Sequence, residues 1–466
     1  MLLLHRWRTR VPLLSLLFLA CGQAATGAPF TPGNVVVYRV GDGSRALAST
    51  GNPVFLDEYR PDGQLVQSLP MPTQTNGAHQ PFAGGGTATS EGWLTRSENK
   101  RCLLVPGYGR DPAITSGNLV SAAGLSRVVG VVAHTGDIDT TTALTDLATG
   151  TNNFRGAAST DCTSLWVASS LDGTRAATIG ASASVAVAAT PAGGRTVAVH
   201  DGQLYNASNT GSNTYKGINR IGTGTPATAA TATRLPGLTD ALTPSPYGFA
   251  FADLDGTPGA DTLYVADDSV GVTKFSLVAG AWVSNGTVGT GADAYRGLAA
   301  VVQGGTVTLY ATRNASDLVA WVDASGYNGA FSGTPAVLAS AGANQAFRGV
   351  APSPEASVTA TASAGLHGTV SPASQTVSYG QPASFSVTPE AGYTAVAGGS
   401  CGGTLAGTAY TTPALTADCS VTVTFTQQPT HTVTPTATTG GTIAPDQPRT
   451  VIDGDPASFT VTPQPG

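Results

Sequence analysis

The sequence predicts an all-β protein in which a large propeller-like domain precedes small β-modules. Three observations predict this fold class. Short apolar runs alternate with turn residues along most of the chain. One sequence pattern recurs at a spacing of roughly 50 residues in the long N-terminal part. A second pattern recurs near the C-terminus, where Phe385 and Phe459 occupy the same place 74 residues apart.

The composition favours strands and excludes one class of partner. Charged residues make up 11% of the 466 residues, whereas about 25% is usual in globular domains. The 59 glycines and 30 prolines suit turns, and the scarcity of Glu, Lys and Arg disfavours long amphipathic helices. The net charge is −6, and no Lys/Arg cluster follows the N-terminus. We therefore expect no nucleic-acid partner, because such binding needs cationic contacts to phosphate.

Residues 1–28 have the three parts of a secretory signal peptide. Arg6, Arg8 and Arg10 make the start basic, residues 11–20 are apolar, and small residues fill positions 24–28. The apolar run is too short for an ordinary transmembrane helix, and no later stretch of the sequence is apolar enough to span a bilayer. The sequence predicts an exported protein, secreted or held at the cell surface, without a transmembrane span.

Cys21 leaves a second mode of processing open. Residues 18–21, Phe-Leu-Ala-Cys, resemble a bacterial lipobox, in which the cysteine is lipidated and becomes the mature N-terminus. Leu19 departs from that pattern, because a small residue is usual there. We favour cleavage near residues 24–28 and keep a lipid anchor at Cys21 as the alternative.

The other four cysteines predict two disulfides. An even number of cysteines in an exported chain usually pairs. Cys401 and Cys419 lie within one small repeat and are expected to pair with each other, which leaves Cys102 for Cys162. No Cys-x-x-Cys spacing or nearby histidine accompanies them, so a metal site is disfavoured.

Residues 29–352 read as one short strand after another. Apolar runs such as residues 35–38, 165–167 and 307–310 are separated by Asp-Gly pairs. Such pairs favour tight hairpin turns, because these turns need positive φ. The pairs are Asp42-Gly43, Asp62-Gly63, Asp172-Gly173, Asp201-Gly202 and Asp255-Gly256.

An aromatic-Arg-Gly pattern repeats within this domain. A spacing of roughly 50 residues suits a four-stranded propeller blade, whereas a β-sandwich array, the rival architecture, does not predict this period. The last copy stops after one strand, and the domain opens with the remaining strands of a blade, so pairing the two ends would close the ring. We count six blades, with seven as the alternative. The copies are Phe154-Arg155-Gly156, Tyr295-Arg296-Gly297 and Phe347-Arg348-Gly349.

A second kind of repeat follows a short linker. The composition changes at residues 353–356, which we interpret as that linker. The first repeat covers residues 357–427, and a truncated second copy covers residues 428–466. Both copies contain Gly-Thr, then Pro-Ala-Ser-Phe, then Val-Thr-Pro at matching positions.

The C-terminal pattern resembles a known family. The motifs Gly-Thr-Val-x-Pro and Pro-Ala-x-Phe-x-Val-Thr-Pro, followed by Cys401, Cys419 and Phe425, resemble the divergent internalin-B-type repeats of bacterial surface proteins. The resemblance covers residues 357–426 well and 431–466 in part. It implies small β-modules, β-grasp-like or immunoglobulin-like, that act as spacers or adhesive units without catalysis. The preceding region looks like the propeller regions that stand before such repeats in secreted proteins of Gram-negative bacteria.

One loop carries a candidate metal site. Asp253, Asp255 and Asp261 lie close together on a glycine-bearing loop. Spaced carboxylates on a tight turn suit Ca²⁺, which takes many oxygen ligands. The alternative is a hairpin in which the aspartates accept hydrogen bonds from the turn backbone. No other cofactor is expected.

The repeated arginines are the candidate ligand site. Arg155, Arg296 and Arg348 occupy one position of the repeat, so they should lie at equivalent places in three blades. If their strand is the innermost, they converge on the central channel and offer paired donors to a carboxylate or sulfate. The alternative, which we favour at this point, is that each arginine ties its blade to a neighbour.

These features favour binding over catalysis. No group of residues has the composition of a catalytic site, so no catalytic residue is predicted and an enzyme is disfavoured. The leading hypothesis is an exported surface protein whose propeller adheres to a glycan or another cell-surface molecule, with the repeats as a stalk. The alternatives are a propeller hydrolase or lyase that acts on a polysaccharide or phosphate ester, and a spacer with no ligand of its own.

Overall fold

The computed structural model describes residues 27–147 and 150–465. Within them the chain is all-β, and its one helical segment is the short 3-10 turn η1 (Gly291–Asp293). No helix among the described residues is long and apolar enough to cross a membrane. The predicted signal peptide lies outside the described residues except for its last two positions, and Cys21 lies outside them altogether.

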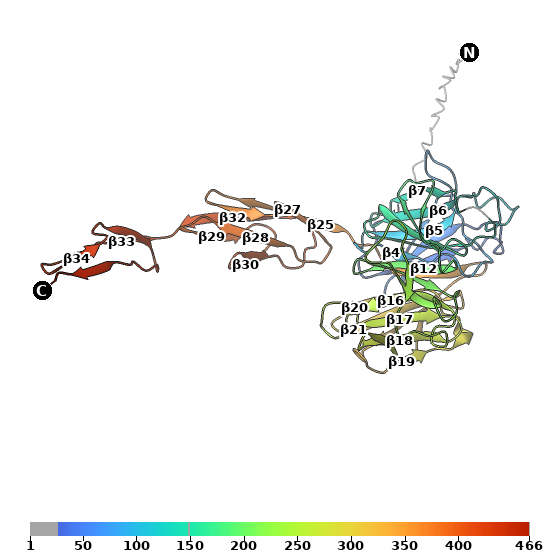
Figure 1. Cartoon of the computed structure of the whole chain (residues 1–466). Helices are drawn as coiled ribbons and strands as arrows, with labels where there is room; N and C mark the ends of the chain where they lie inside the picture. The colour runs from blue at the N-terminus through green and yellow to red at the C-terminus, as the bar shows by residue number, and fades with distance from the viewer. Residues whose placement is uncertain (1–26, 148–149, 466) are drawn as a thin grey trace, which may run out of the picture.

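Six four-stranded antiparallel sheets occupy the N-terminal part of the chain (Figure 1). The first sheet combines one late strand with three early ones: β24 (Ala346–Pro352), β1 (Val35–Val40), β2 (Val54–Tyr59) and β3 (Leu65–Pro70). The second contains β4 (Thr95–Arg96), β5 (Cys102–Tyr108), β6 (Arg127–Ala133) and β7 (Ile138–Leu144). The third contains β8 (Phe154–Ser159), β9 (Ser164–Ser169), β10 (Thr174–Thr178) and β11 (Val185–Ala188).

The other three sheets each use four consecutive strands. The fourth contains β12 (Gly194–His200), β13 (Gln203–Ser208), β14 (Gly217–Ile221) and β15 (Ala232–Arg234). The fifth contains β16 (Pro246–Ala252), β17 (Thr262–Asp267), β18 (Gly271–Val278) and β19 (Ala281–Val288). The sixth contains β20 (Leu298–Gln303), β21 (Thr306–Arg313), β22 (Asp317–Asp323) and β23 (Ala336–Ser340).

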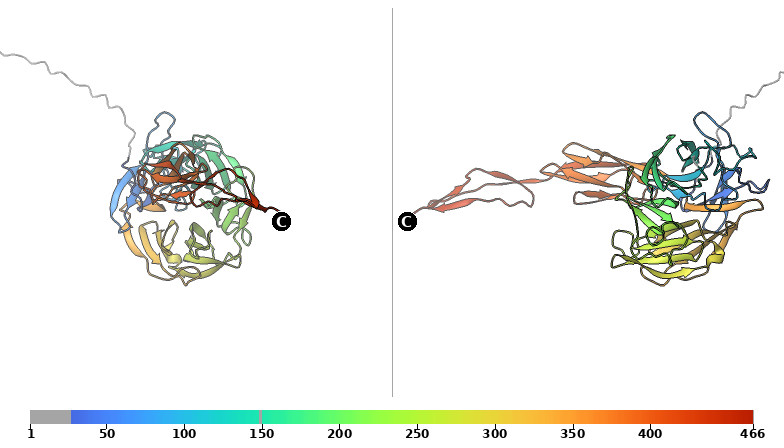
Figure 2. Two further views of the ribbon diagram at one scale, coloured as in Figure 1. Left: turned by 90° about the vertical axis from the view of Figure 1, so that its left-hand side faces the viewer. Right: turned by 45° about the vertical axis from the view of Figure 1, so that its right-hand side comes forward.

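The sheets stand around a common centre, which is the arrangement of a β-propeller (Figure 2, left). The strands β4, β8, β12, β16, β20 and β24 contact their neighbours around the ring and are therefore the innermost. Each sheet is covered on both faces by the next sheets. This explains why strands such as β5 and β17 are buried along their whole length and read in the sequence as continuous apolar runs.

Two ends of the domain meet in the first sheet. Strand β24 pairs antiparallel with β1, with Val350 opposite Val37 and Phe347 opposite Arg39. The structure thus contains the end-to-end pairing that the incomplete last repeat predicts. Because these strands are about 300 residues apart in the sequence, this contact is the least local one in the ring.

The predicted Asp-Gly turns fall between strands. Asp201 and Gly202 join β12 to β13 with φ of +47° and +67°. Positive φ at both central residues is the signature of a type I′ hairpin turn, and Asp and Gly tolerate it best. The remaining four pairs also lie in the connections between strands.

A buried ion pair fastens the fifth sheet to the sixth. Lys274 Nζ on β18 lies 2.8 Å from Asp323 Oδ2 on β22, and both side chains are almost fully buried. The Tyr264 hydroxyl donates a 2.6 Å hydrogen bond to the same carboxylate oxygen. Each buried charge therefore has a partner, as burial requires.

Both predicted disulfides are present. Cys102–Cys162 joins β5 of the second sheet to the β8–β9 turn of the third, across 60 residues. Cys401–Cys419 lies inside the first C-terminal module, across 18 residues. The first bond thus links neighbouring sheets, whereas the second stabilises one small module.

The first C-terminal module contains two four-stranded sheets around one apolar core that includes Phe385, Tyr410 and Val421. In one sheet β25 and β32 are parallel neighbours, with Ala360 opposite Cys419. That sheet has the order β27 (Ser374–Ser378), β25 (Ser357–Ala364), β32 (Cys419–Gln427), β29 (Tyr393–Gly398). The other has the order β26 (Gly368–Ser371), β28 (Ser384–Pro389), β31 (Ala409–Thr411), β30 (Thr404–Ala406).

The second repeat reproduces the first two pairings of the module. Its strands are β33 (Thr430–Val433), β34 (Gly441–Ala444), β35 (Arg449–Ile452) and β36 (Thr460–Pro463). Strand β33 pairs with β35 as β25 does with β27, and β34 pairs with β36 as β26 does with β28. The sequence repeat therefore corresponds to a structural repeat.

The segment between propeller and module is anchored at both ends. Glu355 Oε1 accepts a 2.7 Å hydrogen bond from Arg96 Nη1, and the Ser353 hydroxyl donates to the carbonyl oxygen of Thr31. The Ser378 hydroxyl of the module also donates to the carbonyl oxygen of Asn99. Residues 353–356 are therefore held against the propeller by polar contacts.

Removing the carboxylate of the buried Lys274–Asp323 pair should destabilise the propeller. Asp323→Ala leaves the Lys274 ammonium buried without a charged partner, with only Ser325 Oγ and the Gly326 carbonyl oxygen as acceptors. We therefore expect the free energy of unfolding to fall by about 3–5 kcal/mol. The control is Asp317→Ala, because Asp317 forms a partly exposed pair with Arg313 that should be worth about 1 kcal/mol or less. Urea unfolding followed by tryptophan fluorescence measures both. Equal losses in the two variants would contradict the assignment.

Candidate functional site

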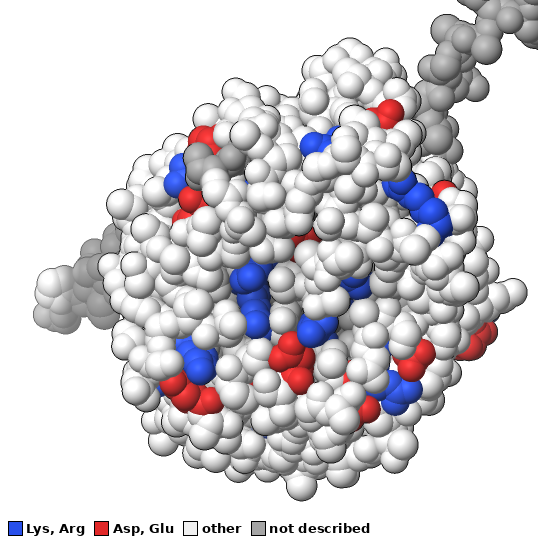
Figure 3. Space-filling view, turned by 90° about the vertical axis from the view of Figure 1, so that its right-hand side faces the viewer, with Lys and Arg blue, Asp and Glu red and all other residues white. Residues whose placement is uncertain are grey.

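The candidate site lies where the innermost strands begin. Trp93 of the second sheet and Gly156 of the third form a parallel bridge, so the first strands of these neighbouring sheets run in the same direction. The chain leaves the end of β24 for the C-terminal modules, so the starts of these strands face away from the modules. Figure 3 looks at the propeller from that side and shows Lys and Arg side chains gathered near the centre, beside acidic ones.

Contacts between neighbouring sheets define one equivalent position in each. The backbone N–H of Gly349 donates to the carbonyl oxygen of Gly92, that of Trp93 to Arg155, and that of Gly248 to Arg296. Following these contacts around the ring gives six equivalent residues. They are Gly92, Arg155, Arg195, Tyr247, Arg296 and Arg348. We call Arg155, Arg195, Arg296 and Arg348 the arginine ring.

Close packing explains why glycine follows three of these arginines. A Cβ added to Gly297 would lie 2.6 Å from the carbonyl oxygen of Arg348, and one added to Gly156 would lie 2.9 Å from that of Arg195. The innermost strands approach each other too closely there for a larger residue. In the Arg-Gly pattern the glycine is therefore required by packing at the centre of the ring. The arginine before it lies at the same level in each of these sheets.

Tyr247 lies between two members of the arginine ring. The Arg195 guanidinium carbon is 3.5 Å from the centre of the Tyr247 ring, and that of Arg296 is 5.2 Å from it. Both distances allow a cation–π interaction. Arg195 Nη1 also donates to the Ser245 hydroxyl and so links the fourth sheet to the fifth.

Two acidic residues accompany this part of the ring. Arg296 donates to Asp268 Oδ2 from Nε and Nη2, at 3.2 and 3.0 Å. The neighbouring Asp267 is buried and accepts backbone N–H bonds from Ser245 and Ser269. Burial raises the pKa of Asp267 to about 6, so this carboxyl gains its charge as pH rises through the mildly acidic range.

The other three arginines have no carboxylate partner among the residues that the structure describes. Arg155 and Arg195 donate to backbone carbonyl oxygens of the next sheet, and Arg348 to those of Phe347 and Gly86. The Nε atom of each is buried without a hydrogen-bond partner in residues 27–147 and 150–465. The interior of the ring therefore holds more cationic donors than the neighbouring acceptors satisfy.

Burial changes the ionisation of this cluster. It lowers the pKa of Arg348 and of Arg195 to about 10, which still leaves both charged at neutral pH. Behind the ring, Glu91 is buried, and its Oε1 accepts hydrogen bonds from the Tyr108 hydroxyl and Asn153 Nδ2. Burial raises the pKa of Glu91, so this acid offsets the ring charge less well than a solvated carboxylate.

The sequence left two roles open for Arg155, Arg296 and Arg348: binding a ligand in the channel, or tying one sheet to the next. The geometry is compatible with both. Arg155 ties its sheet to the next through a backbone carbonyl oxygen, and Arg296 ties the sixth sheet to Asp268 in the fifth. All three also lie at the same level of the innermost strands. The sequence did not reveal Arg195, because Gly194-Arg195-Thr196 lacks both the aromatic residue and the glycine of the pattern.

The predicted calcium ligands lie in the β16–β17 loop, at the opposite end of the innermost strand from the arginine ring. One carboxylate oxygen from each of Asp253, Asp255 and Asp261 lies within 4.8 Å of the others. Asp261 Oδ2 accepts backbone N–H bonds from Leu254 and Asp255, as the hairpin alternative requires. Three oxygens are fewer than the six to eight that Ca²⁺ takes, so carbonyl oxygens and water would have to supply the rest.

Comparisons with known proteins found similarity of structure and none of sequence. No family model matches the chain, and no curated protein matches it. A nidogen/laminin complex structure is 11% identical, with a TM-score of 0.40, over 68% of this chain and 97% of that one. A protein of unknown function from Bacteroides caccae is 12% identical, with a TM-score of 0.37, over 70% and 100%.

A third structure, the dihydro-heme d1 dehydrogenase NirN in complex with DHE, is 13% identical, with a TM-score of 0.32. The similarity covers 66% of this chain and 55% of NirN. At such low identity, similarity of structure says nothing about a ligand. The function of this chain has to be inferred from its own side chains.

Replacing a buried arginine of the ring should not destabilise the fold. Arg348 is 2% exposed and has no carboxylate partner in the described part of the chain. We therefore expect Arg348→Met to leave the free energy of unfolding within about 1 kcal/mol or to raise it. The control is Arg39→Met, which leaves the buried Asp57 without a charged partner and should cost about 3–5 kcal/mol. A loss of that size in Arg348→Met, measured by urea unfolding, would mean that Arg348 is purely structural.

Proposed function

We propose that this protein is an exported ligand-binding protein that captures an anionic group at the arginine ring. In this proposal the six sheets are the blades of one propeller, and the C-terminal repeats are internalin-B-type modules that form a stalk. The ring lies on the face directed away from that stalk, where a partner has free access. The signal-peptide pattern of residues 1–28 and the two disulfides support export, since disulfides persist in oxidising compartments.

One observation carries the proposal. Three guanidinium groups at equivalent positions lack a carboxylate partner within the described residues, and each has a buried Nε without an acceptor. Unneutralised buried charge is costly, and several such groups at one level of a channel point to an anionic ligand. A carboxylate or sulfate supplies paired oxygen acceptors in the geometry that guanidinium groups bind best. The half-buried Arg155 and Arg296 would contact the anion, while Arg195 and Arg348 add charge behind them.

The ligand class that fits best is an acidic glycan. Carboxylate or sulfate groups repeat along such chains, so many weak contacts can add up on a surface-exposed protein. Tyr247 and Trp93 lie beside the ring, 5.2 Å apart in an edge-to-face arrangement, but both are buried, so the guanidinium groups would make the glycan contacts. Adhesion to a glycan-bearing surface is therefore the proposed role.

A second candidate function is cleavage of the same glycan. The buried Glu91 lies near the arginine ring, and burial raises its pKa, which is the direction expected of a general acid. Its Oε1 is already engaged by Tyr108 and Asn153, which favours a structural role. A lyase or hydrolase is therefore the less favoured proposal.

Calcium binding at Asp253, Asp255 and Asp261 remains a separate proposal. Asp253 and Asp255 are exposed in the β16–β17 loop, and the buried Asp261 lies at its end, so the exposed part of the loop would have to complete the coordination. It would stabilise that loop and would not contribute to the arginine ring.

Binding should depend on sulfate or carboxylate groups and on the ring. We expect the full chain to retain dextran sulfate but not unsulfated dextran, and Arg155→Met and Arg296→Met each to weaken retention about tenfold. Arg60→Met is the matched control, because it removes the same charge from an exposed arginine of the first sheet. Isothermal titration gives the affinities, and mass spectrometry of the glycan gives its length.

The outcomes of this experiment distinguish adhesion, glycan cleavage and a non-specific effect of charge. Retention without shortening, lost in the ring variants but not in Arg60→Met, supports adhesion. Shortening of the glycan would instead favour the enzyme. Equal losses in Arg60→Met and the ring variants would show that only the overall charge matters, and the ring would then not be the site.

Binding should also weaken as pH rises. Below about pH 6 Asp267 is neutral, and above it a negative charge appears beside Arg195 and Asp268. A sulfate group stays charged throughout, so we expect its affinity to fall about threefold between pH 5 and pH 7.5. Asp267→Asn should bind at pH 7.5 as wild type does at pH 5 and show a flat profile. A profile unchanged by Asp267→Asn would exclude this carboxyl as the cause.

A further inference from the structure

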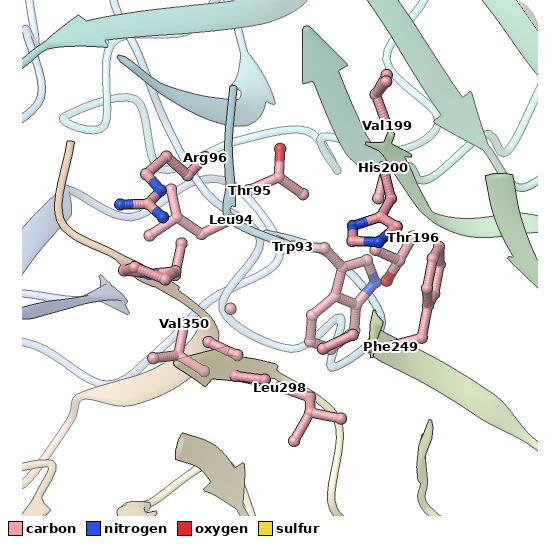
Figure 4. Close-up of a pocket in the computed structure, with 18 of the residues that line it drawn as sticks. Trp93, Leu94, Thr95, Arg96, Thr196, Val199, His200, Phe249, Leu298 and Val350 are labelled. Carbon is pink, nitrogen blue, oxygen red and sulfur yellow. The ribbon is translucent and has the colours of Figure 1, made fainter. Parts of the chain in front are cut away.

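A separate cavity of about 360 Å³ opens at the other end of the innermost strands (Figure 4). It lies on the side from which the chain leaves for the modules, and strands β4, β12, β16, β20 and β24 line it. Its inner walls include the apolar Phe249, Leu298, Val350 and Ala300, and polar and charged residues also line it. A cavity of this volume falls within the range of small-ligand sites. We call it the module-side cavity.

Trp93 separates this cavity from the arginine ring. At the place where the other innermost strands have Gly or Thr, β4 is preceded by Trp93, whose side chain therefore fills the centre of the channel. Figure 4 shows the indole between Thr196 and Phe249 on one side and Leu298 and Val350 on the other. Its opposite neighbour is Tyr247, which belongs to the level of the ring. The two sites therefore lie on different sides of one side chain.

Two polar atoms of the cavity lining lack partners. Trp93 and Thr196 are 2% and 5% exposed, and both line the cavity. Neither Trp93 Nε1 nor Thr196 Oγ1 has a hydrogen-bond partner among the residues that the structure describes. Buried polar atoms in native proteins are nearly always satisfied. Two such atoms just beneath the surface of one cavity point to a missing partner, which a small turn of their side chains would admit. An indole N–H can only donate, so that partner must carry an acceptor.

Most charged residues at the mouth are engaged, and the ammonium of Lys100 is the exception among the described residues. Arg96 pairs with Glu355, and Glu98 accepts the backbone N–H of Gly202. His200 lies 3.3 Å from Asp201 and stacks on Phe251. Burial lowers the pKa of His200, so its imidazole is neutral at neutral pH. The positive Arg96 and Lys100 and the negative Glu98 and Asp201 leave the mouth close to neutral. This balance favours an uncharged ligand.

We propose that the module-side cavity binds a neutral small molecule with a ring-sized apolar body and one carbonyl or hydroxyl oxygen. The oxygen accepts a hydrogen bond from Trp93 Nε1 and exchanges a second one with the Thr196 hydroxyl, while the body packs against Phe249, Leu298 and Val350. This site is independent of the anion site, because its ligand is uncharged and enters from the opposite face.

The test uses neutral naphthyl probes with the full chain. Prodan, a naphthyl ketone fluorophore, should bind saturably with a blue-shifted emission. In competition, 2-acetylnaphthalene should displace it about fivefold more effectively than 2-ethylnaphthalene, which has the same size but no oxygen. Trp93→Phe should abolish that preference. Trp321→Phe is the matched control, because Trp321 Nε1 is also buried without a partner but does not line the cavity.

Two further variants keep the test decisive. If Trp93→Phe does not fold, Thr196→Val removes the other unpartnered atom and should also reduce the preference for the ketone. Ala300→Phe fills the cavity and should weaken prodan binding more than tenfold. Equal prodan binding by Ala300→Phe and wild type, or an unchanged ketone preference in Trp93→Phe, would overturn the proposal. Dextran sulfate binding should be unchanged in Ala300→Phe, which separates failure here from failure at the arginine ring.

Discussion

The close approach of six innermost strands around one centre is the constraint on which the rest of the structure depends. It exists only because β24, from the end of the domain, pairs with β1 from its beginning. The strands come so near that Gly156, Gly248, Gly297 and Gly349 cannot carry a Cβ without displacing a neighbouring backbone. The same crowding brings the residue before each glycine to one level. Ring closure therefore creates both the packing at the centre and the arginine ring.

The ring shows how stability and binding compete at one place. An apolar residue at Arg348 would satisfy packing without burying a charge, yet the chain has a guanidinium there with only carbonyl acceptors. Elsewhere in the same propeller, Lys274 pairs with Asp323 and Arg39 pairs with Asp57. Arg127 on β6 is the exception among the described residues, because it is buried and donates only to backbone carbonyl oxygens. What distinguishes the arginine ring is that four guanidinium groups lie at equivalent positions of the innermost strands. This clustering locates the function more sharply than the overall fold does, because propellers serve many purposes.

Local signals in the sequence predicted much of the architecture. Asp201-Gly202 marked a hairpin because only a few residues tolerate positive φ. The Arg-Gly repeat predicted Arg155, Arg296 and Arg348 because ring packing imposes the same glycine in several sheets. Arg195 escaped notice because Thr196 replaces that glycine. Glu91, Asp267 and Asp268 could not be assigned to the site either, since only the tertiary fold brings them next to the arginines.

The module-side cavity was equally hidden from sequence reasoning. Trp93 stands in a stretch with little strand character, and nothing local indicates that its indole lies at the centre of the ring. Trp93 can separate the cavity from the arginine ring because it occupies a repeat position at which the other five sheets have Gly or Thr. Repeat positions that depart from the common residue are therefore the most informative ones in this chain.

The most direct test of the arginine ring is a crystal structure of the full chain grown with selenate, an anomalous scatterer with the shape of sulfate. Our account predicts a selenium peak on the propeller face away from the modules, within hydrogen-bond distance of Arg155 and Arg296. The same crystals should lack that peak in Arg155→Met. If the ring instead binds only ordered water, and selenate is found elsewhere or nowhere, the arginines hold the blades together and the anion site does not exist.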